Sequence, residues 1–409
     1  MRVLLCHRFF WPDTPPYASM LRAIGAHLVR RGHDVTVFSA QPSYRPGAHV
    51  AQQPAQQVLD GIRVRRTSLI REKRKDTVVR GTNALLFSAR LFLHLLFGRS
   101  YEVVTVSTFP PVVLGAAACL ACKLRGYDFI YHCMDIHPEV SINTSGKTVG
   151  PWLRVLRRID AWTCRNATRV VVLSADMRQT IRSRPRTEGL DVRVINNFEL
   201  PAFEDSVVEA EVDKPETHDK SPHVLRVLFA GNAGRFQGLE SVVRAAALVD
   251  RDLIQVTLMG DGVMKPVLVR LARELGCTNV QFVSFRPPKV ARKAMEQSDF
   301  GLVTLARGMY RVAYPSKTMT YLKAGCPLIV LVEKESQLAS EVIENRLGYV
   351  VPAQEPASLA AVLREAYDHR HEWRSARSRL RNYAAATTAP EVAFGQWDKM
   401  LAGLESERR

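Results

Sequence analysis

The sequence predicts an α/β protein made of two β/α domains, each organised around a parallel sheet. Short apolar runs rich in Val, Ile and Leu, typical of strands buried on both faces, alternate with longer helix-forming segments along the whole chain. This alternation stops once, at residues 204–223, where acidic residues and two prolines occur without any aromatic side chain. Such a composition indicates an exposed linker. We therefore expect domains at 1–203 and 224–389, with a C-terminal helix at 390–409 joined to the first.

The first domain begins with a strand, a helix and a second strand. Arg2–Cys6 is an apolar run, Gly32 closes the helix that follows it, and Asp34–Ala40 is the next apolar run. A β/α/β unit of this length implies parallel pairing. The other strands expected in this domain are 62–69, 101–107, 127–132, 169–173 and 193–195, with helices near 84–98, 112–125, 152–167 and 176–184.

The second domain restarts the same alternation after the linker. Its first strand, 224–230, is rich in Val and Leu and stops at Gly231. Strand 254–259 runs into the second glycine-rich turn, Gly260-Asp261-Gly262. The remaining expected strands are 280–285, 300–305, 327–332 and 349–351, and the helices are 239–249, 263–275, 288–297, 315–324, 337–345, 356–384 and 390–405.

Composition narrows the class of protein. The 46% hydrophobic and 24% charged fractions are ordinary for a folded domain. Seven scattered cysteines favour a reducing compartment, and the C-x-x-C of Cys119 and Cys122 lacks the second pair that a zinc site needs, so we interpret both as helix core. No signal peptide is expected, and the most apolar window, 84–98, is too short to span a bilayer.

The net charge of +17 lies mostly in the first half, since residues 1–204 carry 29 Lys and Arg against 15 Asp and Glu. The densest run, 63–80, includes Arg71, Lys73, Arg74 and Lys75 and is followed at once by the apolar segment. A basic run before an apolar helix favours an anionic membrane surface, although a solvated face is the alternative. We expect no nucleic-acid partner, because no basic, aromatic-interleaved sheet or helix-turn-helix accompanies the run.

The glycine-rich turn after strand 224–230 is the first candidate binding site. Gly231, Gly234 and Gly238 lie between the strand and the next helix, a geometry in which backbone N–H groups approach an anion closely. A tight turn without a ligand is the competing interpretation, because the spacing is not G-x-G-x-x-G. A second segment, Tyr314-Pro315-Ser316-Lys317, opens another helix after another strand and favours the anion site.

Two stretches of the first domain are candidates for chemistry. His132, Asp135 and Glu139 follow strand 127–132, at the strand end where catalytic groups of parallel sheets lie. A simple turn with Asp135 capping a helix is the alternative. The aromatic, proline-rich loop from Phe9 to Tyr17, with Trp11, either lines a substrate groove or packs its rings inward; we expect the groove.

Several motifs of the chain together resemble a known family. In the second half they are Gly231-Asn-Ala-Gly-Arg-Phe-Gln-Gly238-Leu-Glu, Gly260-Asp-Gly262, Pro315-Ser-Lys317, Tyr321-x-x-Ala-Gly325-x-Pro327 and Gly348-Tyr-Val-Val-Pro352. In the first half they are Arg31-Gly32-His33-x-Val35, Phe109-Pro-Pro111 and Asp135-x-x-Pro138-Glu139. Over nearly its whole length the chain resembles family 4 of the retaining GT-B glycosyltransferases, in particular the bacterial branch that builds lipid-linked surface polysaccharides.

The resemblance implies a GT-B fold, with two Rossmann-like domains facing each other across a cleft, and a hexosyl transfer from a nucleotide-diphosphate sugar without a metal or other cofactor. It implies that Asp135, Glu139 and, less directly, His132 face the transferred sugar or the acceptor. It implies a lipid-linked or glycan acceptor. From the aromatic loop and the basic run we expect acceptor and membrane contacts at Trp11, Tyr17, Arg71, Lys73, Arg74 and Lys75. The donor-binding residues that it implies are Gly231, Asn232, Arg235, Gln237, Gly260, Asp261, Gly262, Ser316, Lys317, Thr320 and Asn197.

The chain departs from the family pattern at two acidic positions. The family carries a Glu-x7-Glu motif, and Val312 and Thr320 occupy those two places here. The second glutamate is expected to bind the donor ribose, and a carboxylate does so more strongly than a hydroxyl. We therefore expect either a deoxyribose donor such as a dTDP-sugar or weaker binding. Gln237 likewise stands where many members carry a phosphate-binding lysine, which leaves Arg235 or Lys317 to compensate.

The sequence thus predicts a glycosyltransferase that is peripheral to the inner face of the cytoplasmic membrane. Two other functions compete with it: a GT-B sugar-nucleotide epimerase, which would interconvert its donor without an acceptor, and a non-catalytic nucleotide- or sugar-binding protein, which would bind its ligand without turnover.

Overall fold

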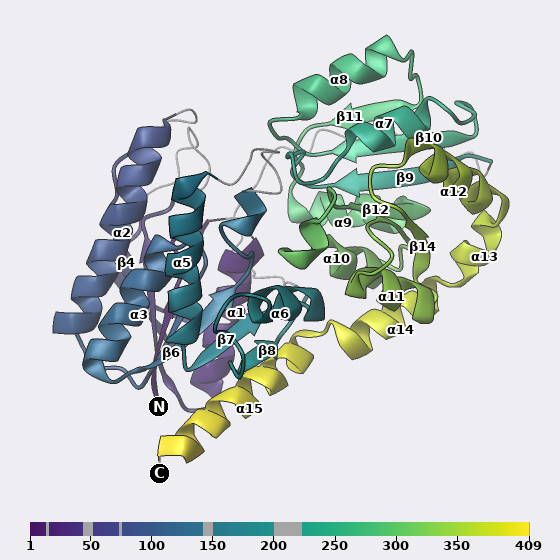
Figure 1. Ribbon diagram of the computed structural model, residues 1–409. Helices are drawn as coiled ribbons and strands as arrows, with labels where there is room; N and C mark the ends of the chain where they lie inside the picture. Colours follow the sequence, from purple (N-terminus) through teal and green to yellow (C-terminus); the bar gives the residue numbers. More distant parts are fainter. Residues whose placement is uncertain (14–15, 44–51, 73–75, 142–149, 200–222, 409) are drawn as a thin grey trace. The chain divides into compact units, whose positions relative to one another are not determined.

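The chain forms two compact units, shown in Figure 1. The computed structural model describes residues 1–13, 16–43, 52–72, 76–141, 150–199 and 223–408. One unit comprises Met1–Ala202, Val312–Tyr314 and Pro390–Arg409, and the other comprises Phe203–Arg311 and Pro315–Ala389. We call them the N-terminal and the C-terminal unit. The expected linker, 204–223, lies outside the described residues except for its last residue.

The N-terminal unit contains an eight-stranded sheet in which β1 lies near the centre. All neighbouring strands pair in parallel except β3 and β4, which are antiparallel. In sheet order the strands are β3 (Gln56–Leu59), β4 (Ile62–Thr67), β2 (Asp34–Ala40), β1 (Arg2–Cys6), β5 (Val103–Ser107), β6 (Asp128–Cys133), β7 (Arg169–Val172) and β8 (Val192–Val194).

Helices cover both faces of this sheet. Helix α1 connects β1 to β2, on one side of β1 in the sheet, whereas α2, α3, α5 and α6 each connect to a strand further towards the β8 edge. Because crossovers between parallel strands are right-handed, connections in opposite directions place their helices on opposite faces. Helix α1 therefore covers one face, and the other four cover the opposite face. On that face α3 packs between α2 and α5. The bounds are α1 (Pro16–Arg30), α2 (Thr77–Phe97), α3 (Val113–Arg125), α5 (Pro151–Arg165) and α6 (Ala175–Arg182).

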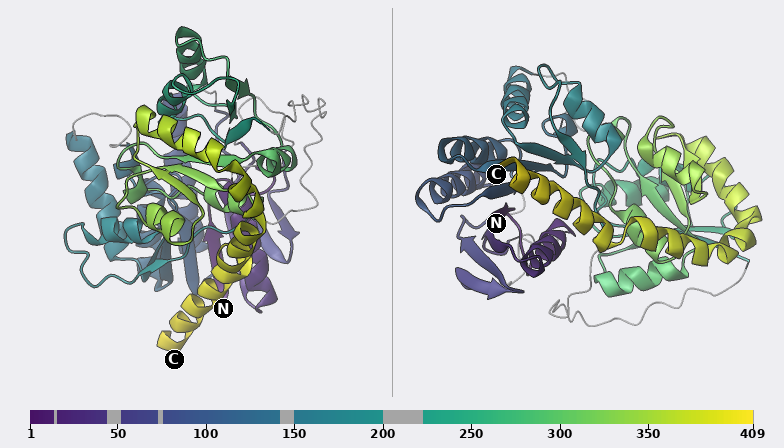
Figure 2. Two further views of the ribbon diagram at one scale, coloured as in Figure 1. Left: turned by 90° about the vertical axis from the view of Figure 1, so that its right-hand side faces the viewer. Right: turned by 90° about the horizontal axis from the view of Figure 1, so that it is seen from below.

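The last helix of the chain, α15 (Pro390–Arg408), belongs to the N-terminal unit, where it packs on α1. Figure 2 shows it in yellow, ending at the C-terminus. The His27 ring on α1 stacks on Phe394 with 4.4 Å between ring centroids, and its Nε2 lies 2.9 Å from a carboxylate oxygen of Asp398. Trp397 and Leu401 are buried on the same helix. These contacts explain why a segment so distant in sequence folds with the first half.

The C-terminal unit contains a six-stranded, wholly parallel sheet. The chain reverses its direction of travel between β9 and β12, so that right-handed crossovers put α7 and α8 on one face and α9, α10 and α11 on the other. In sheet order the strands are β11 (Val280–Val283), β10 (Ile254–Met259), β9 (Leu225–Ala230), β12 (Phe300–Thr304), β13 (Leu328–Leu331) and β14 (Gly348–Val351). The helices are α7 (Glu240–Ala246), α8 (Lys265–Glu274), α9 (Pro288–Gln297), α10 (Lys317–Lys323), α11 (Gln337–Glu344), α12 (Pro356–Asp368), α13 (Arg370–Ser375) and α14 (Arg377–Thr387), with a 3₁₀ turn, η1, at Met309–Arg311.

Three features differ from the sequence-based expectation. Strand β3 was missed because Gln56–Leu59 is polar and lies at the sheet edge, where it stays largely exposed. The single helix expected over 356–384 is three helices, α12 to α14, and Trp373 on α13 packs there against Phe300 and Tyr349 with centroid separations of 5.8 and 5.5 Å. Helix α2 begins earlier than the apolar segment, because the Asp76 carboxylate caps it by accepting from the Val79 N–H.

A buried ion-pair cluster holds the β6 side of the N-terminal unit together. Arg184, just after α6, is fully buried and donates from Nη1 to Asp160 on α5 at 2.6 Å. Its Nη2 donates to the Glu139 carboxylate at 2.8 Å and to the His137 carbonyl at 2.9 Å. The Tyr131 hydroxyl on β6 donates to the other oxygen of Asp160 at 2.7 Å. The guanidinium therefore ties α5 and α6 to the loop that follows β6.

Replacing Arg184 should test this cluster. We expect Arg184→Met to lower the free energy of unfolding by about 3–5 kcal/mol, because Asp160 would be left as an unpaired buried carboxylate. Denaturant unfolding measures this loss. The exposed Arg182→Met serves as the control and should stay within about 0.5 kcal/mol of wild type. If Arg184→Met lowered the free energy of unfolding by less than about 1 kcal/mol, the Arg184 cluster would not be a major source of stability in this unit.

Candidate active site

The carboxyl edge of the C-terminal sheet forms a topological switch point between β9 and β12. Neighbouring strands there send their following helices, α7 and α10, to opposite faces, and ligands of such sheets bind in the crevice beyond the strand ends. The Gly231–Gly238 turn leaves β9 at this point, and the segment 305–316 leaves β12 beside it. The Ala306 N–H donates to the Phe236 carbonyl at 2.7 Å, which joins the two segments.

Glycine is required where the β9 and β10 turns meet. Gly260 has φ +136°, and a Cβ built there would lie 1.9 Å from the Gly231 carbonyl oxygen. A Cβ on Gly262 would lie 2.2 Å from the carbonyl oxygen of Ala233. The Ala233 N–H in turn donates to the Asp261 carbonyl at 2.9 Å. No side chain fits between these backbones, so both glycines permit an approach that other residues would block.

Lys317 lies directly over Gly231. A Cβ on Gly231 would be 1.8 Å from the lysine Cε and 2.1 Å from its Nζ, so the ammonium group occupies the space that the missing side chain leaves. The Nζ also lies 5.1 Å from the centroid of the Phe229 ring. Burial lowers the pKa of Lys317 to about 8. The Lys317 ammonium group is thus held at the carboxyl end of β9, on a half-buried side chain beside the glycine turn.

Tyr321 holds helix α10, which carries Lys317, against strand β9. It is fully buried on α10, one turn after Lys317, and its hydroxyl donates to the Leu228 carbonyl and accepts from the Ala230 N–H, both at 2.8 Å. Helix α10 is therefore pinned to the last residues of β9. This contact sets the distance between Lys317 and the glycine turn.

The other donor-binding residues predicted in this unit surround the same turn. The Gln237 side-chain oxygen accepts from the Gly234 N–H at 3.0 Å, so it braces the turn. Asp261 pairs with Lys265 at 2.9 Å and accepts from the Phe285 N–H at 3.1 Å, which links the ends of β10 and β11. The remaining members are Asn232 and Arg235, which are exposed, Ser316 at the start of α10, and the half-buried Thr320 on that helix. A small cavity extends from Gly231 and Gly260 towards Phe282.

Asn197 is the one predicted donor-binding residue that lies in the N-terminal unit. It follows β8, it is 9% exposed, and its backbone N–H donates to the Asn196 side chain at 2.7 Å.

The predicted catalytic residues of the N-terminal unit lie on and after β6, in three different environments. Asp135 is half-buried, and burial raises the pKa of its carboxyl group. His132 is buried, its Nδ1 lies 2.8 Å from the Tyr17 hydroxyl, and burial lowers its pKa to about 3. Glu139 is held by Arg184 and by Arg157, whose Nε lies 3.2 Å away. Among the residues that the structure describes, Asp135 forms no ion pair with an arginine. His132 stays neutral, and Glu139 is part of the Arg184 cluster.

The predicted acceptor and membrane residues are also dispersed. Tyr17 is 7% exposed and packs its ring edge-on against His132. Trp11 is half-buried, with the Arg22 guanidinium 5.4 Å from its ring centroid. Arg71 is exposed, and Lys73, Arg74 and Lys75 lie outside the described residues.

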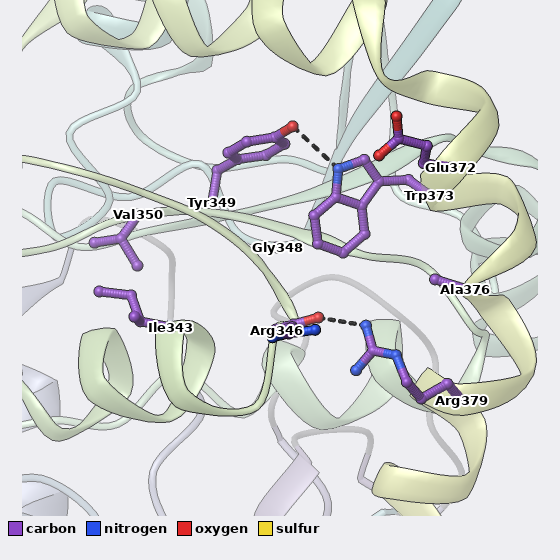
Figure 3. A pocket seen from close by; sticks show the side chains of 9 residues that line it. All are labelled: Ile343, Arg346, Gly348, Tyr349, Val350, Glu372, Trp373, Ala376 and Arg379. Carbon is purple, nitrogen blue, oxygen red and sulfur yellow. Dashed lines mark hydrogen bonds between the residues drawn. The ribbon is translucent and has the colours of Figure 1, made fainter.

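A larger cavity, of about 480 Å³, lies at the other edge of the C-terminal sheet. Figure 3 shows its lining, in which Trp373 and Tyr349 point towards each other beside Arg346 and Arg379. It borders Gly348, at the amino end of β14, whereas Gly231 follows the carboxyl end of β9. None of the predicted site residues lines this cavity. We therefore place the candidate site at the switch point, where cation, glycine turns and strand ends coincide.

Sequence reasoning missed Glu333, which follows β13 at the same edge as the glycine turn. Its Oε1 accepts from the Gly308 N–H at 2.5 Å. The signal was available, since an acidic residue directly after a buried strand falls at the carboxyl edge of a parallel sheet. The family pattern directed attention instead to positions 312 and 320.

Two protein-family models match the chain, one over each unit. The model described as "Glycosyl transferase 4-like domain" matches residues 17–197, and "Glycosyl transferases group 1" matches residues 225–369. The first match lies in the N-terminal unit, and the second contains Gly231, Lys317 and the whole six-stranded sheet.

Two curated proteins are related to the chain. It is 27% identical over 288 residues to WbjE of Pseudomonas aeruginosa, a glycosyltransferase by name. The alignment covers 69% of this chain and 70% of the relative. It is 24% identical over 363 residues to WcaI of Escherichia coli K12, by name a colanic acid biosynthesis glycosyl transferase. The alignment covers 85% of this chain and 88% of the relative.

Solved structures share the fold at low identity. Sucrose-phosphate synthase from Thermosynechococcus elongatus matches the full length of both chains with a TM-score of 0.76 and 15% identity. HepE from Anabaena, solved in complex with UDP-glucose, has a TM-score of 0.66 and 15% identity over 98% of this chain and all of its own. WaaG, a lipopolysaccharide-biosynthesis glycosyltransferase, has a TM-score of 0.66 and 16% identity over 96% of this chain and 98% of its own.

These matches confirm the GT-B fold and the enzyme class that the motifs predict. The chain belongs to family 4 of the GT-B glycosyltransferases, enzymes that transfer a sugar from a nucleotide-sugar donor.

Proposed function

We propose that the protein is a retaining hexosyltransferase of surface-polysaccharide synthesis, which moves a hexose from a nucleotide-diphosphate sugar to a polyprenyl-pyrophosphate-linked saccharide. The observation that carries the donor half of this proposal is the Lys317 Nζ lying over Gly231 at the switch point of its sheet. The acceptor half is supported by the name of the relative WcaI and by the surface of the N-terminal unit described below.

In this proposal the donor diphosphate binds against the Gly231–Gly238 turn. The leaving nucleoside diphosphate gains negative charge as the glycosidic bond breaks, and a cation already in place stabilises that charge without reorganisation. Lys317 is that cation, the Ser316 hydroxyl is a further donor, and the exposed Arg235 reaches the same turn. Because these groups supply the positive charge, the scheme needs no metal ion. The nucleobase lies beside Gly260-Asp261-Gly262, where the small cavity opens. Asn197 is a further donor-binding residue in this proposal.

The N-terminal unit contributes the acceptor side. Asp135 accepts a hydrogen bond from the transferred sugar or the acceptor hydroxyl, and its raised pKa makes it a stronger base than an exposed carboxylate. Glu139 acts as a positioning residue, because through Arg184 it fixes the loop that carries Asp135. His132 stays neutral and orients the Tyr17 hydroxyl beneath the aromatic loop.

We propose that α2 docks this unit on an anionic membrane. One face of the helix exposes Val78, Leu85, Leu93 and Phe97, whose relative exposures run from 52% to 81%, while its other face packs on α3. On the same side of the sheet α5 exposes Trp152 at 68%. Among the described residues no helix is long and apolar enough to cross a bilayer. An apolar helix face flanked by basic residues is the usual means of interfacial binding.

The titration of Lys317 gives a test of the donor site. Its pKa of about 8 means that the ammonium group loses its proton as pH rises through 8, so nucleotide affinity should fall above that pH by up to about tenfold per pH unit. Calorimetric titration from pH 7 to pH 9, with the best-bound of UDP, GDP, ADP and dTDP, measures this. Lys317→Met should bind weakly and without this dependence, whereas Lys323→Met, exposed on the same helix, should keep the wild-type profile. Equal wild-type affinity at pH 7 and pH 9 would contradict the role.

Thr320 gives a test of nucleotide choice. We expect Thr320→Glu to raise the affinity for UDP by about tenfold, because a carboxylate accepts charge-assisted hydrogen bonds from ribose hydroxyls. The affinity for dTDP, which lacks the 2′-hydroxyl, should rise less. Thermal-shift titrations with the two nucleotides make the comparison. Equal gains for UDP and dTDP, or a loss for UDP, would show that position 320 does not face the ribose.

The exposed face of α2 gives a test of membrane docking. The double variant Leu93→Glu/Phe97→Glu should bind vesicles containing phosphatidylglycerol at least about tenfold more weakly than wild type, because two exposed apolar side chains that would enter the membrane, and their transfer free energy, are lost. Vesicle co-sedimentation measures the partition. Ile343→Glu, equally exposed at 61% but on the C-terminal unit, is the control and should leave binding unchanged. Unchanged binding of the double variant would exclude α2 as the docking helix.

A further inference from the structure

Glu333 lies at the carboxyl edge of the C-terminal sheet, two residues beyond the end of β13. Strand β13 is the neighbour of β12, with Thr304 in register with Leu331. The Glu333 side chain therefore lies beside the segment that follows β12, which contains Gly308. Since β13 is further than β12 from β10, Glu333 lies further than Gly308 from the proposed nucleobase site at Gly260.

The carboxylate of Glu333 is only half satisfied. Its Oε1 accepts from the Gly308 N–H at 2.5 Å. Its Oε2 is buried and has no hydrogen-bond partner among the residues that the structure describes. A carboxylate accepts several hydrogen bonds, and leaving one of its oxygens buried without a partner is unfavourable. The residue as a whole is half-buried, and rotation about its last torsion, which is soft, exchanges the two oxygens.

Glu333 is connected to the proposed diphosphate turn through two short contacts. Glu333 accepts a hydrogen bond from the N–H of Gly308, which lies two residues after Ala306. The Ala306 N–H donates to the carbonyl of Phe236, within the turn, at 2.7 Å. A Cβ on Gly238, at the end of the turn, would lie 3.8 Å from the Ala306 Cα. The carboxylate is thus part of the wall of the same site.

The order of the strands says which part of the donor reaches it. Gly260 follows β10, Gly231 follows β9, and Glu333 follows β13, in the sheet order β10-β9-β12-β13. Strands lie about 4.8 Å apart, so Glu333 is displaced by about 10 Å from Gly231, on the side away from Gly260. A donor with its base at Gly260 and its diphosphate at Gly231 projects its sugar in this direction.

The segment nearest to that sugar supplies no other carboxylate. Residues 305–317 contain no Asp or Glu, and Val312 and Thr320 stand at the positions where the family pattern has acidic residues. Sugar hydroxyls are recognised most strongly by charged acceptors. Glu333 places one beside this segment from the next strand.

We propose that Glu333 binds hydroxyl groups of the transferred sugar and thereby distinguishes the complete donor from its free nucleotide. The inference rests on the proposed function, since it takes the diphosphate to lie at Gly231. Two hydroxyl groups of the hexose donate to the carboxylate, one of them to the oxygen that is buried without a partner.

Glu333→Gln tests this because the amide oxygen still accepts from the Gly308 N–H, while the negative charge is lost. The ligands are the tightest-bound of UDP-glucose, UDP-galactose, UDP-N-acetylglucosamine, GDP-mannose and dTDP-glucose, and the nucleoside diphosphate that it contains. Calorimetry should show that the variant binds the nucleotide sugar about tenfold or more weakly, and the free diphosphate within about twofold of wild type. Glu335→Gln, exposed in the same turn, should leave both affinities unchanged.

Two results would overturn the inference while the proposed function stands. One is equal weakening of both ligands, which would mean that Glu333 only supports the Gly308 segment. The other is unaltered affinity for the nucleotide sugar. If the wild-type protein bound neither nucleotide sugars nor nucleoside diphosphates, the proposed function itself would fail, and this inference with it.

Discussion

The contact on which the rest of the site depends is the approach of two backbone turns and one ammonium group at the end of β9. Gly231 has no side chain, and Lys317 fills the space that one would occupy. Gly260 allows the β10 turn to touch the Gly231 carbonyl. Tyr321 hydrogen-bonds to the backbone of β9 and so keeps α10, which carries Lys317, next to the glycine turn. Substituting any side chain into this contact displaces either the cation or a strand end, which explains why the glycines and the lysine occur together.

Partial burial gives Lys317 its chemical character. An exposed lysine keeps its charge far above neutral pH, whereas desolvation beside Phe229 lowers the pKa of Lys317 to about 8. The ammonium group therefore lacks part of its hydration before a ligand arrives, and an anion that replaces the lost water interacts with it strongly. The cost is a charge that is lost as the pH rises above about 8.

The sequence was sufficient to predict the fold and the grouping of the C-terminal candidate residues around the glycine turns, because both depend on short-range patterns. Alternating apolar runs predict the parallel sheets, and the glycine turns lie directly after their strands. It was insufficient wherever a side chain finds its partner far along the chain. Glu139 and Arg184 are 45 residues apart, and Tyr17 and His132 are 115 residues apart. No local pattern reveals such pairs, so the sequence does not show that Glu139 lies in an ion-pair cluster or that His132 is buried beside Tyr17. Glu333 was missed for another reason: its place after a buried strand was visible in the sequence, but the family pattern directed attention to positions 312 and 320. Its contact with the Gly308 N–H, in the segment after β12, could not be read from the sequence.

A crystal structure with a bound nucleoside diphosphate tests the account most directly. The account predicts that the β-phosphate lies within hydrogen-bond distance of the Lys317 Nζ and of backbone N–H groups of the Gly231–Gly238 turn, with the base beside Gly262. A nucleotide bound instead in the cavity between Trp373 and Arg379, or a diphosphate that makes no contact with Lys317, would contradict it.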